Sequence, residues 1–345
     1  MLLDVFARVD ENPLESIATT AAAADAIGFA ALWTPETGHN PFLPLVLAAE
    51  HSTRLGLGTA VAIAFPRSPM VTAQLAWDLA SYSDGRFLLG LGTQVRAHIE
   101  RRFSAPFDQP VARLRDYIAA LRAIWATFQS GARLNYRGPF YQHTLMVPFF
   151  NPGPIDHPAI PIYIAGVNSG LAQLAGEVAD GFHAHPFNSA KYLREELRPQ
   201  IAAGAAKAGR EPSACQVAGS VFVITGDDAA AVETTRAFVR QQIAFYASTP
   251  TYRPVLECHG WGDVGERLSQ LASQQRWAEM AAQVSDEMLA AFAVEAPPAG
   301  LGEALRERYG GLLDRVGLYS LPFVPGERDE FWRGLVRDLA GSTPS

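Results

Sequence analysis

Eight short apolar runs are spaced along the chain, and longer stretches with a helical spacing of apolar residues separate them. Most of the runs are continuous rather than alternating, which is typical of parallel strands whose outer face is covered by helices. Strands that alternate with helices indicate repeated βα units around a parallel sheet. The runs lie at residues 2–7, 29–33, 55–63, 86–92, 160–165, 181–185, 216–224 and 316–321. Eight such units predict an α/β fold of the (β/α)8 or TIM barrel type.

Three of the helical stretches have readable ends. Pro13 lies near the start of the first stretch, and Gly28 follows its last apolar residue. Pro69 and Gly85 bound the second stretch in the same way, and Gly131 ends a third, longer one. Proline is favoured in the first turn of a helix and glycine just after the last turn. These boundaries therefore predict separate helices between the strands.

Two connections between the runs are much longer than a simple βα unit needs. They cover residues 94–159 and 225–315. Connections of this length carry additional structure of their own in a folded domain. Because no low-complexity linker divides the chain, we expect residues 1–345 to form one barrel domain. Its insertions would lie between strands 4 and 5 and between strands 7 and 8.

The balance of charges restricts the partners of this chain. It has 28 Lys and Arg residues against 35 Asp and Glu residues, a net charge of −7, which argues against a general nucleic-acid-binding protein. No run of about 18 apolar residues occurs, and no basic leader follows Met1, so we expect neither a membrane span nor a signal peptide. Cys215 and Cys258 are too few for a disulfide framework. We therefore expect a cytoplasmic enzyme that acts on a small molecule, without a nucleic-acid or membrane partner.

The sequence Leu-Gly-Leu-Gly-Thr occurs twice, at residues 55–59 and 89–93. The 34 positions between the two copies are close to one βα unit of a barrel. We interpret the copies as neighbouring strands whose glycines let a ligand approach the backbone; the alternative is coincidence in a chain rich in Gly and Leu. The third glycine of a dinucleotide fingerprint is replaced by Val61 in one copy and by Val95 in the other, which argues against that motif.

A His-x-His pair, His183 and His185, lies in the sixth predicted strand. Alternate residues of a strand point to the same face, so the pair could bind a metal ion in a hydrolase barrel. However, the first predicted strand contains no His, and no further ligand cluster accompanies the pair. We therefore predict that the pair lines the barrel mouth and that no metal is bound, and we keep a metal-dependent hydrolase as an alternative.

Polar and glycine-rich segments follow several predicted strands, at the barrel end where such enzymes place their chemistry. They lie at residues 34–42, 59–62, 93–102 and 165–170. The last segment opens a helix, where backbone N–H groups favour an anion such as phosphate. Ordinary N-capping by Asn168 or Ser169 explains the same residues without a ligand. Both interpretations remain open at this point.

Five segments, taken in order, resemble the bacterial-luciferase-like superfamily and, within it, the branch that uses the deazaflavin coenzyme F420. They lie at residues 28–33, 48–59, 81–92, 161–166 and 179–182. The third segment is similar to the family pattern S-x-G-R-x-x-L-G-x-G. Each motif alone is weak, but the series is specific, and the resemblance extends over nearly the whole chain.

The resemblance implies an oxidoreductase barrel that holds the deazaflavin ring at the C-terminal ends of its strands. It also implies a non-prolyl cis peptide bond in a bulge on the third strand, at Ala60–Val61. A small organic substrate would exchange a hydride with C5 of the cofactor. We expect the cofactor to contact Thr59, Ala60, Val61, Ala62, Gly92, Thr93, Gln94, Ala165, Gly166, Val167, Asn168, Ser169, Gly170 and His183.

Four residues are the candidates for catalysis. Glu36 and His39 match the family segment that meets the ring edge. Sugar-phosphate-oxidising relatives place a catalytic Glu at the position of Val95, so we do not expect that reaction here. His98 and Glu100 are the alternative acid/base candidates, although the same residues also fit a charged helix start on the surface.

The leading hypothesis is therefore an F420-dependent oxidoreductase. An FMN-dependent luciferase-like monooxygenase is the alternative within the family, and a cofactor-binding barrel without activity, suggested by Val95, is the alternative outside enzymes. An anionic cofactor on an acidic protein needs local positive charge, for which Arg67, Arg96, Arg101 and Arg102 are available. We also expect a homodimer, because exposed apolar helix faces of such barrels often form dimers.

Overall fold

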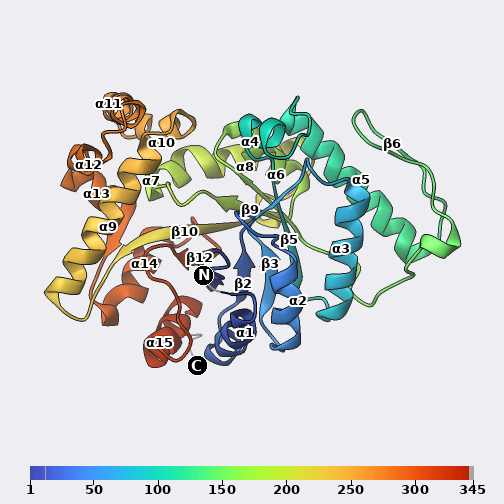
Figure 1. Cartoon of the computed structure of the whole chain (residues 1–345), viewed down its shortest axis with the longest axis horizontal. Coiled ribbons are helices and arrows are strands. Elements are labelled where there is room, and N and C mark those ends of the chain that lie inside the picture. Colours follow the sequence, from blue (N-terminus) through green and yellow to red (C-terminus); the bar gives the residue numbers. More distant parts are fainter. Residues whose placement is uncertain (12, 342–345) are drawn as a thin grey trace.

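Eight parallel strands close into a barrel in the computed structural model, which describes residues 1–11 and 13–341. Around the barrel they are β1 (Leu2–Phe6), β2 (Ala31–Thr34), β3 (Gly56–Thr59) with its short continuation β4 (Ala62–Ile63), β5 (Phe87–Gly92), β8 (Ile162–Gly166), β9 (Gly181–Ala184), β10 (Gln216–Ile224) and β12 (Arg315–Leu318). Strand β10 pairs with β9 and β12, and β12 pairs with β1, which closes the circuit. The predicted (β/α)8 barrel is confirmed (Figure 1).

Every predicted apolar run overlaps one of these strands, although β2, β8 and β12 each extend one residue beyond their run, and the third run is divided. Residues 56–59 form β3 and pair with β2 and β5, whereas Ala62 and Ile63 form β4 and pair only with β5. The Ala60–Val61 peptide bond between the two pieces is cis, as the resemblance implied. The third strand therefore ends in a bulge that projects Val61 towards the C-terminal mouth of the barrel.

Helices surround the barrel and fill both insertions (Figure 1). They are α1 (Ser16–Ile27), α2 (Leu43–Glu50), α3 (Pro69–Tyr82), α4 (Arg96–Arg101), α5 (Pro110–Ser130), α6 (Ser169–Val178), α7 (Ala190–Tyr192), α8 (Arg198–Lys207), α9 (Ala229–Ala247), α10 (Arg253–Glu257), α11 (Gly262–Ser273), α12 (Trp277–Met280), α13 (Asp286–Phe292), α14 (Leu301–Tyr309) and α15 (Asp329–Ala340). Gly28 and Gly131 end α1 and α5 with positive φ angles, which glycine adopts without a Cβ clash. The helix ends read from the sequence are thus close to the observed ones.

Both predicted insertions are present. The first contains α4, α5, the hairpin of β6 (Tyr136–Arg137) and β7 (Gln142–His143), and the short helix η1 (Pro148–Phe150). The second contains α9 to α14 and one additional strand, β11 (Ala293–Glu295), which extends the sheet beside β10. In Figure 1 the two insertions lie on opposite sides of the barrel.

The repeated Leu-Gly-Leu-Gly-Thr segments do form neighbouring strands, since β3 pairs with β5. Glycine is required at Gly58 and Gly90, however, because neighbouring protein atoms leave no room for a Cβ there. A Cβ on Gly58 would lie 2.1 Å from the Trp33 ring, and a Cβ on Gly90 would lie 1.8 Å from the Thr59 carbonyl oxygen. The prediction that these two glycines open the backbone to a ligand is wrong, because protein atoms occupy the space in front of them.

Among the described residues, no helix combines the length and the apolar character that crossing a membrane would need.

Candidate functional site

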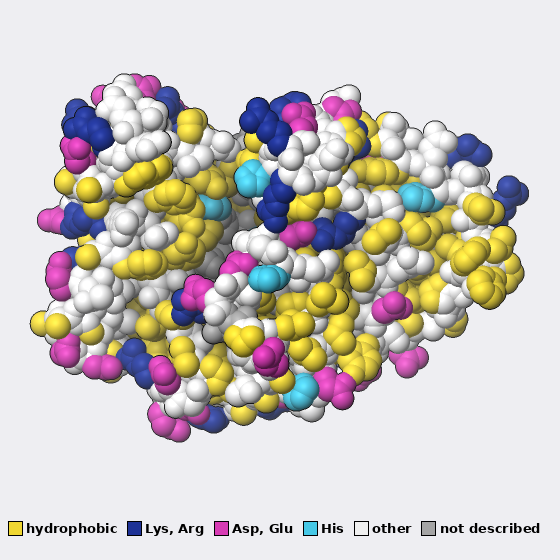
Figure 2. Space-filling model, in the orientation of Figure 1, with side chains coloured by type: hydrophobic (Ala, Val, Ile, Leu, Met, Phe, Trp, Pro, Cys, Tyr) yellow, Lys and Arg dark blue, Asp and Glu magenta, His cyan; other side chains and the backbone are white. Residues whose placement is uncertain are grey.

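A cavity of about 1340 Å³ lies at the C-terminal ends of the barrel strands. Figure 2 shows the surface hollowed between the part that carries α9 and α10 and the part that carries α4. Of the predicted site residues, those that line the cavity are Glu36, Ala60, Val61, Gly92, Thr93, Gln94, Ala165, Gly166, Val167, Asn168 and His183. Those outside its lining are His39, Thr59, Ala62, His98, Glu100, Ser169 and Gly170. The structure thus brings most of the predicted cofactor-binding residues together around one cavity.

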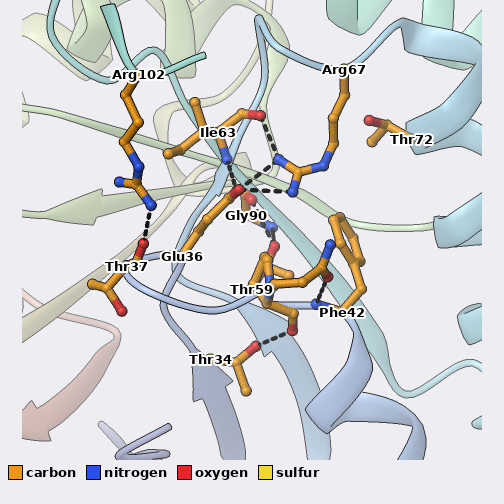
Figure 3. Close-up of polar contacts among 12 residues, drawn as sticks. Thr34, Glu36, Thr37, Phe42, Thr59, Ile63, Arg67, Thr72, Gly90 and Arg102 are labelled. Carbon is orange, nitrogen blue, oxygen red and sulfur yellow. Dashed lines mark hydrogen bonds and ion pairs between the residues drawn. The ribbon is translucent and has the colours of Figure 1, made fainter. Parts of the chain in front are cut away.

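Thr59 and Ala62 support the bulge from behind. The Thr59 hydroxyl donates a hydrogen bond to the Gly90 carbonyl (2.7 Å) and accepts one from the Gly90 N–H (2.9 Å), as Figure 3 shows. Ala62 is 1% exposed and pairs with Leu91 of β5. Both residues therefore fix the strand on either side of the Ala60–Val61 bond and leave these two residues facing the cavity.

The carboxylate of Glu36 joins the loops that follow β2 and β3 (Figure 3). It accepts hydrogen bonds from the Arg67 guanidinium at 2.7 and 2.8 Å and from the Ile63 N–H at 2.6 Å. Arg67 also donates to the Ile63 carbonyl oxygen (2.9 Å). The Glu36 side chain is only 6% exposed, so this charged pair is held in a largely dry wall of the cavity.

The remaining catalytic candidates are exposed and lie outside the cavity lining. His39 and His98 are exposed, and Glu100 pairs with Arg96 at 2.8 Å on the surface of α4. Of the four arginines expected to supply positive charge, Arg96 alone is among the residues that line the cavity. Arg67 is paired with Glu36, and Arg102 donates to the Thr37 carbonyl oxygen (Figure 3).

The end of β8 leads directly into α6. Ala165, Gly166 and Val167 line the cavity, and the Asn168 side chain accepts a hydrogen bond from the Leu171 N–H at 3.0 Å. Asn168 is therefore an ordinary N-cap of α6. Within the described part of the chain, the N–H groups of Ser169 and Gly170 make no hydrogen bond. The helix start can thus serve as an N-capped end and still offer two donors to an anion.

His183 lies inside the barrel between two aromatic rings. Its ring centroid is 4.6 Å from that of Trp33, at a near-perpendicular angle, and 5.1 Å from that of Tyr163. Burial, with a smaller contribution from Arg315, lowers the pKa of His183 to about 3, so the imidazole is neutral at physiological pH. Its Nε2 atom has no hydrogen-bond partner among the described residues. A buried nitrogen of this kind, in a residue of the cavity lining, needs a partner that the protein does not provide.

Asp4, which lines the cavity, belongs to a buried ion pair with Arg315. The Asp4 carboxylate accepts two hydrogen bonds from Arg315, at 2.8 and 2.7 Å, and one from the Trp33 indole at 2.8 Å. Burial raises the pKa of the Asp4 carboxyl, and the Arg315 guanidinium opposes that shift. Sequence reasoning missed this group, although an acidic residue inside the apolar run 2–7 was a signal for it.

Both ring nitrogens of His185, the second histidine of the pair, contact protein groups. His185 lines the cavity, its Nδ1 accepts from the Phe187 N–H (3.1 Å), and its Nε2 lies 3.0 Å from the Tyr252 hydroxyl. Burial lowers the pKa of His185 to about 4. No group of three or more His, Cys, Asp or Glu side chains within residues 1–11 and 13–341 is arranged to hold a metal ion.

The wall opposite the β3–β5–β8 side contains residues that sequence reasoning did not identify. Tyr246 of α9 and Tyr319, which follows β12, line the cavity with their hydroxyls 2.7 Å apart. Tyr246 belongs to the second insertion, in which the sequence offers no local motif.

Comparison with known proteins agrees with this architecture. The model of the luciferase-like monooxygenase family matches residues 3–315. The chain is 48% identical over 328 residues to an uncharacterized protein of Mycobacterium tuberculosis, with 95% of each chain covered. It is 29% identical over 314 residues to a 5,10-methylenetetrahydromethanopterin reductase of Methanolobus tindarius, with 89% of each covered.

A solved structure supports the same fold. The coenzyme F420-dependent tetrahydromethanopterin reductase of Methanopyrus kandleri superposes with a TM-score of 0.79 at 20% identity, and the match covers 98% of both chains. The family model spans most of the chain, and the motifs that carried the resemblance lie within the matched residues. The chain therefore belongs to the luciferase-like monooxygenase family.

Proposed function

We propose that this protein is an oxidoreductase that uses coenzyme F420 to exchange a hydride with a small organic substrate. The observation that carries the proposal is the wall built from Ala60–Val61, Gly92 and Ala165–Gly166, beside the unpaired Nε2 of the neutral His183. Small residues leave room for a flat ring, and a neutral imidazole provides a hydrogen-bond partner for its polar edge. The coenzyme F420-dependent reductase among the structural neighbours supports the choice of cofactor.

The residues that would hold the cofactor fall into two groups. Ala60, Val61 and Gly92, with Thr93 and Gln94, would pack against the ring. The start of α6, where the N–H groups of Ser169 and Gly170 make no hydrogen bond within the described part of the chain, would bind the anionic side chain of the cofactor. When bound, coenzyme F420 supplies the carbon that accepts or donates the hydride.

The protein itself would orient the ring and exclude water. Glu36 and Arg67 would hold the bulge that backs the ring, and His183 would keep a neutral nitrogen at its edge. His98 and Glu100 lie on α4, a few residues beyond Gln94 and Val95 of the lining, and stay acid/base candidates together with His39.

An anaerobic turnover assay tests this proposal. The protein is loaded with oxidised or reduced coenzyme F420 and offered a panel of alcohols, ketones and enones, and the change in cofactor absorption is followed. We expect substrate-dependent conversion of the cofactor. Oxygen consumption with reduced FMN and the same panel, without conversion of coenzyme F420, would instead favour the luciferase-like monooxygenase.

We also propose that two copies of the chain associate in the cytoplasm. Exposed apolar side chains gather on α2, α3 and η1; these residues are Leu43, Val46, Val71, Tyr82, Phe149 and Phe150. Figure 2 shows hydrophobic groups over the side of the molecule that carries these elements. Light scattering should give twice the 37.3 kDa of one chain. Val46→Asp should lower that mass, whereas Trp277→Asp, on the far side of the barrel, should not.

A further inference from the structure

The cavity wall opposite the proposed ring site is built around a pair of phenols. Tyr246 and Tyr319 both line the cavity, and their hydroxyl oxygens are 2.7 Å apart. The Tyr319 hydroxyl also lies 3.3 Å from Oε1 of Gln242, one turn before Tyr246 on α9. The three side chains therefore form a hydrogen-bonded chain that ends at the cavity.

Buried aromatic rings hold the two phenols in place. Phe222 packs edge-on against Tyr319 with ring centroids 5.0 Å apart, and Phe187 lies 6.4 Å from Tyr246. Phe222 and Phe187 are at most 1% exposed, so the tyrosine rings rest on a close-packed core. Burial raises the pKa of Tyr246, which keeps its hydroxyl protonated at physiological pH. The wall thus presents hydroxyl groups in fixed positions.

A chain of this kind can present either a donor or an acceptor to the cavity. When Tyr319 donates to Gln242 and Tyr246 donates to Tyr319, the Tyr246 oxygen is left to accept from a ligand hydroxyl. When the direction is reversed, with the amide of Gln242 turned so that its NH₂ group donates, Tyr246 donates to a ligand carbonyl. An alcohol and the corresponding ketone differ in this respect, because only the alcohol oxygen carries a proton.

The charges around the cavity argue against an anionic ligand on this side. Among the lining residues that the structure describes, the cations are Arg8 and Arg96, and each is paired with an acidic neighbour, Glu11 or Glu100. Apolar side chains, among them Phe238, Leu318 and Leu321, line the same cavity together with hydroxyl residues such as Thr234 and Ser320. A phosphate or carboxylate bound there would lose its water without gaining an unpaired cation.

We propose that Tyr246, hydrogen-bonded through Tyr319 to Gln242, binds the oxygen of a neutral substrate, an alcohol or its ketone on an apolar body. This inference rests on the proposed function, since a hydride-transfer enzyme must accommodate both oxidation levels of its substrate. The phenols are specificity-determining residues, which select the substrate by its oxygen and its lack of charge.

Calorimetric titration with four probes of similar size tests this assignment. The probes are acetophenone, 1-phenylethanol, α-methylstyrene, which has acetophenone's shape without its oxygen, and phenyl phosphate. They are titrated into the wild type, Tyr246→Phe, Tyr319→Phe and Tyr309→Phe, whose hydroxyl is buried in α14 outside the cavity lining. Each titration is run with and without coenzyme F420, and circular dichroism checks that the variants are folded.

The wild type should bind acetophenone and 1-phenylethanol more tightly than α-methylstyrene and phenyl phosphate. Tyr246→Phe and Tyr319→Phe should weaken the binding of acetophenone and 1-phenylethanol by about tenfold and leave the binding of α-methylstyrene unchanged. Tyr309→Phe should leave the binding of all three probes unchanged. Tighter binding of phenyl phosphate than of acetophenone, or equal binding of acetophenone and α-methylstyrene by the wild type, would overturn the assignment. Failure of coenzyme F420 to bind would refute the proposed function alone, because the cofactor-free titrations still decide the substrate class.

Discussion

The guanidinium of Arg67 holds the carboxylate of Glu36 through two parallel hydrogen bonds of 2.7 and 2.8 Å (Figure 3). The same carboxylate accepts the Ile63 N–H at 2.6 Å. One side chain thus ties the loop after β2 to the bulge that lines the cavity. Since the carboxylate is satisfied by protein donors, Glu36 acts in this structure as a positioning residue for the bulge.

We expect Glu36→Gln to destabilise the protein by about 3 kcal/mol, because it leaves the largely desolvated Arg67 charge, 15% exposed, without a carboxylate. Urea unfolding gives the free energy, and titration with coenzyme F420 should show weaker binding, since the bulge loses its anchor. The matched control is Glu266→Gln, which removes an exposed partner of Arg253 and should change the free energy of unfolding by less than about 0.5 kcal/mol. Equal effects of the two substitutions on the free energy of unfolding would contradict the role of the Glu36–Arg67 pair in holding the bulge.

The two buried histidines make stability depend on pH. Folding lowers the pKa of His183 from 6.5 to about 3 and that of His185 to about 4. The unfolded chain therefore binds protons below about pH 6.5 that the folded protein does not bind until the pH is much lower. Their contribution to stability is complete above about pH 6.5 and is lost as the pH falls towards 4, by at most about 1.4 kcal/mol per pH unit for each histidine.

Urea unfolding at pH 7, 6 and 5 (about the range in which a free imidazole titrates) checks this dependence. His183→Gln should flatten the decline of unfolding free energy with falling pH relative to the wild type. His51→Gln removes an exposed histidine and should leave the decline as it is in the wild type. Identical pH profiles for the wild type and His183→Gln would show that His183 is not held neutral by the fold.

Removing only one partner of the buried Asp4–Arg315 ion pair should lower the free energy of unfolding strongly. Asp4→Asn leaves the Arg315 charge, 8% exposed, without its carboxylate and should cost about 3 kcal/mol. The double variant Asp4→Asn with Arg315→Met should be more stable than Asp4→Asn alone, because no unpaired charge remains. Additive losses in this double-mutant cycle would mean that the two residues do not interact energetically.

Gly90 should tolerate no side chain. A Cβ there would lie 1.8 Å from the Thr59 carbonyl oxygen, an atom of the barrel backbone that cannot move without disturbing the bulge. We expect Gly90→Ala to lower the melting temperature strongly or to prevent folding. Gly334→Ala on α15 is the control, because its nearest contact is 3.9 Å away and alanine favours a helix by about 1 kcal/mol. A Gly90→Ala protein as stable as the wild type would contradict the observed β3–β5 packing.

The positions of the strands could be predicted because their signals are local. A continuous apolar run and a nearby Gly or Pro are enough to place β1 or β10, and residues 216–224 of the predicted run coincide with β10. The third run was harder, because the division between β3 and β4 followed from the family resemblance and from no property of residues 55–63 themselves.

The site depended on pairs that lie far apart in the sequence. Asp4 and Arg315 are separated by 311 positions, and Tyr246 and Tyr319 by 73. A single sequence contains no local pattern that connects such residues, and their meeting depends on closure of the barrel and on the path of the second insertion. The same limit applies to Glu36, for which the sequence indicated a place at the cavity but gave no sign of its pairing with Arg67.

Titration of the cofactor-free protein with coenzyme F420 and, separately, with FMN tests the central proposal most directly. Tryptophan fluorescence can report binding, because Trp33 packs against His183 below the proposed ring site. We expect saturable quenching by coenzyme F420 at micromolar or lower concentration, with much weaker binding of FMN. Micromolar binding of FMN without any response to coenzyme F420 would contradict the proposed function.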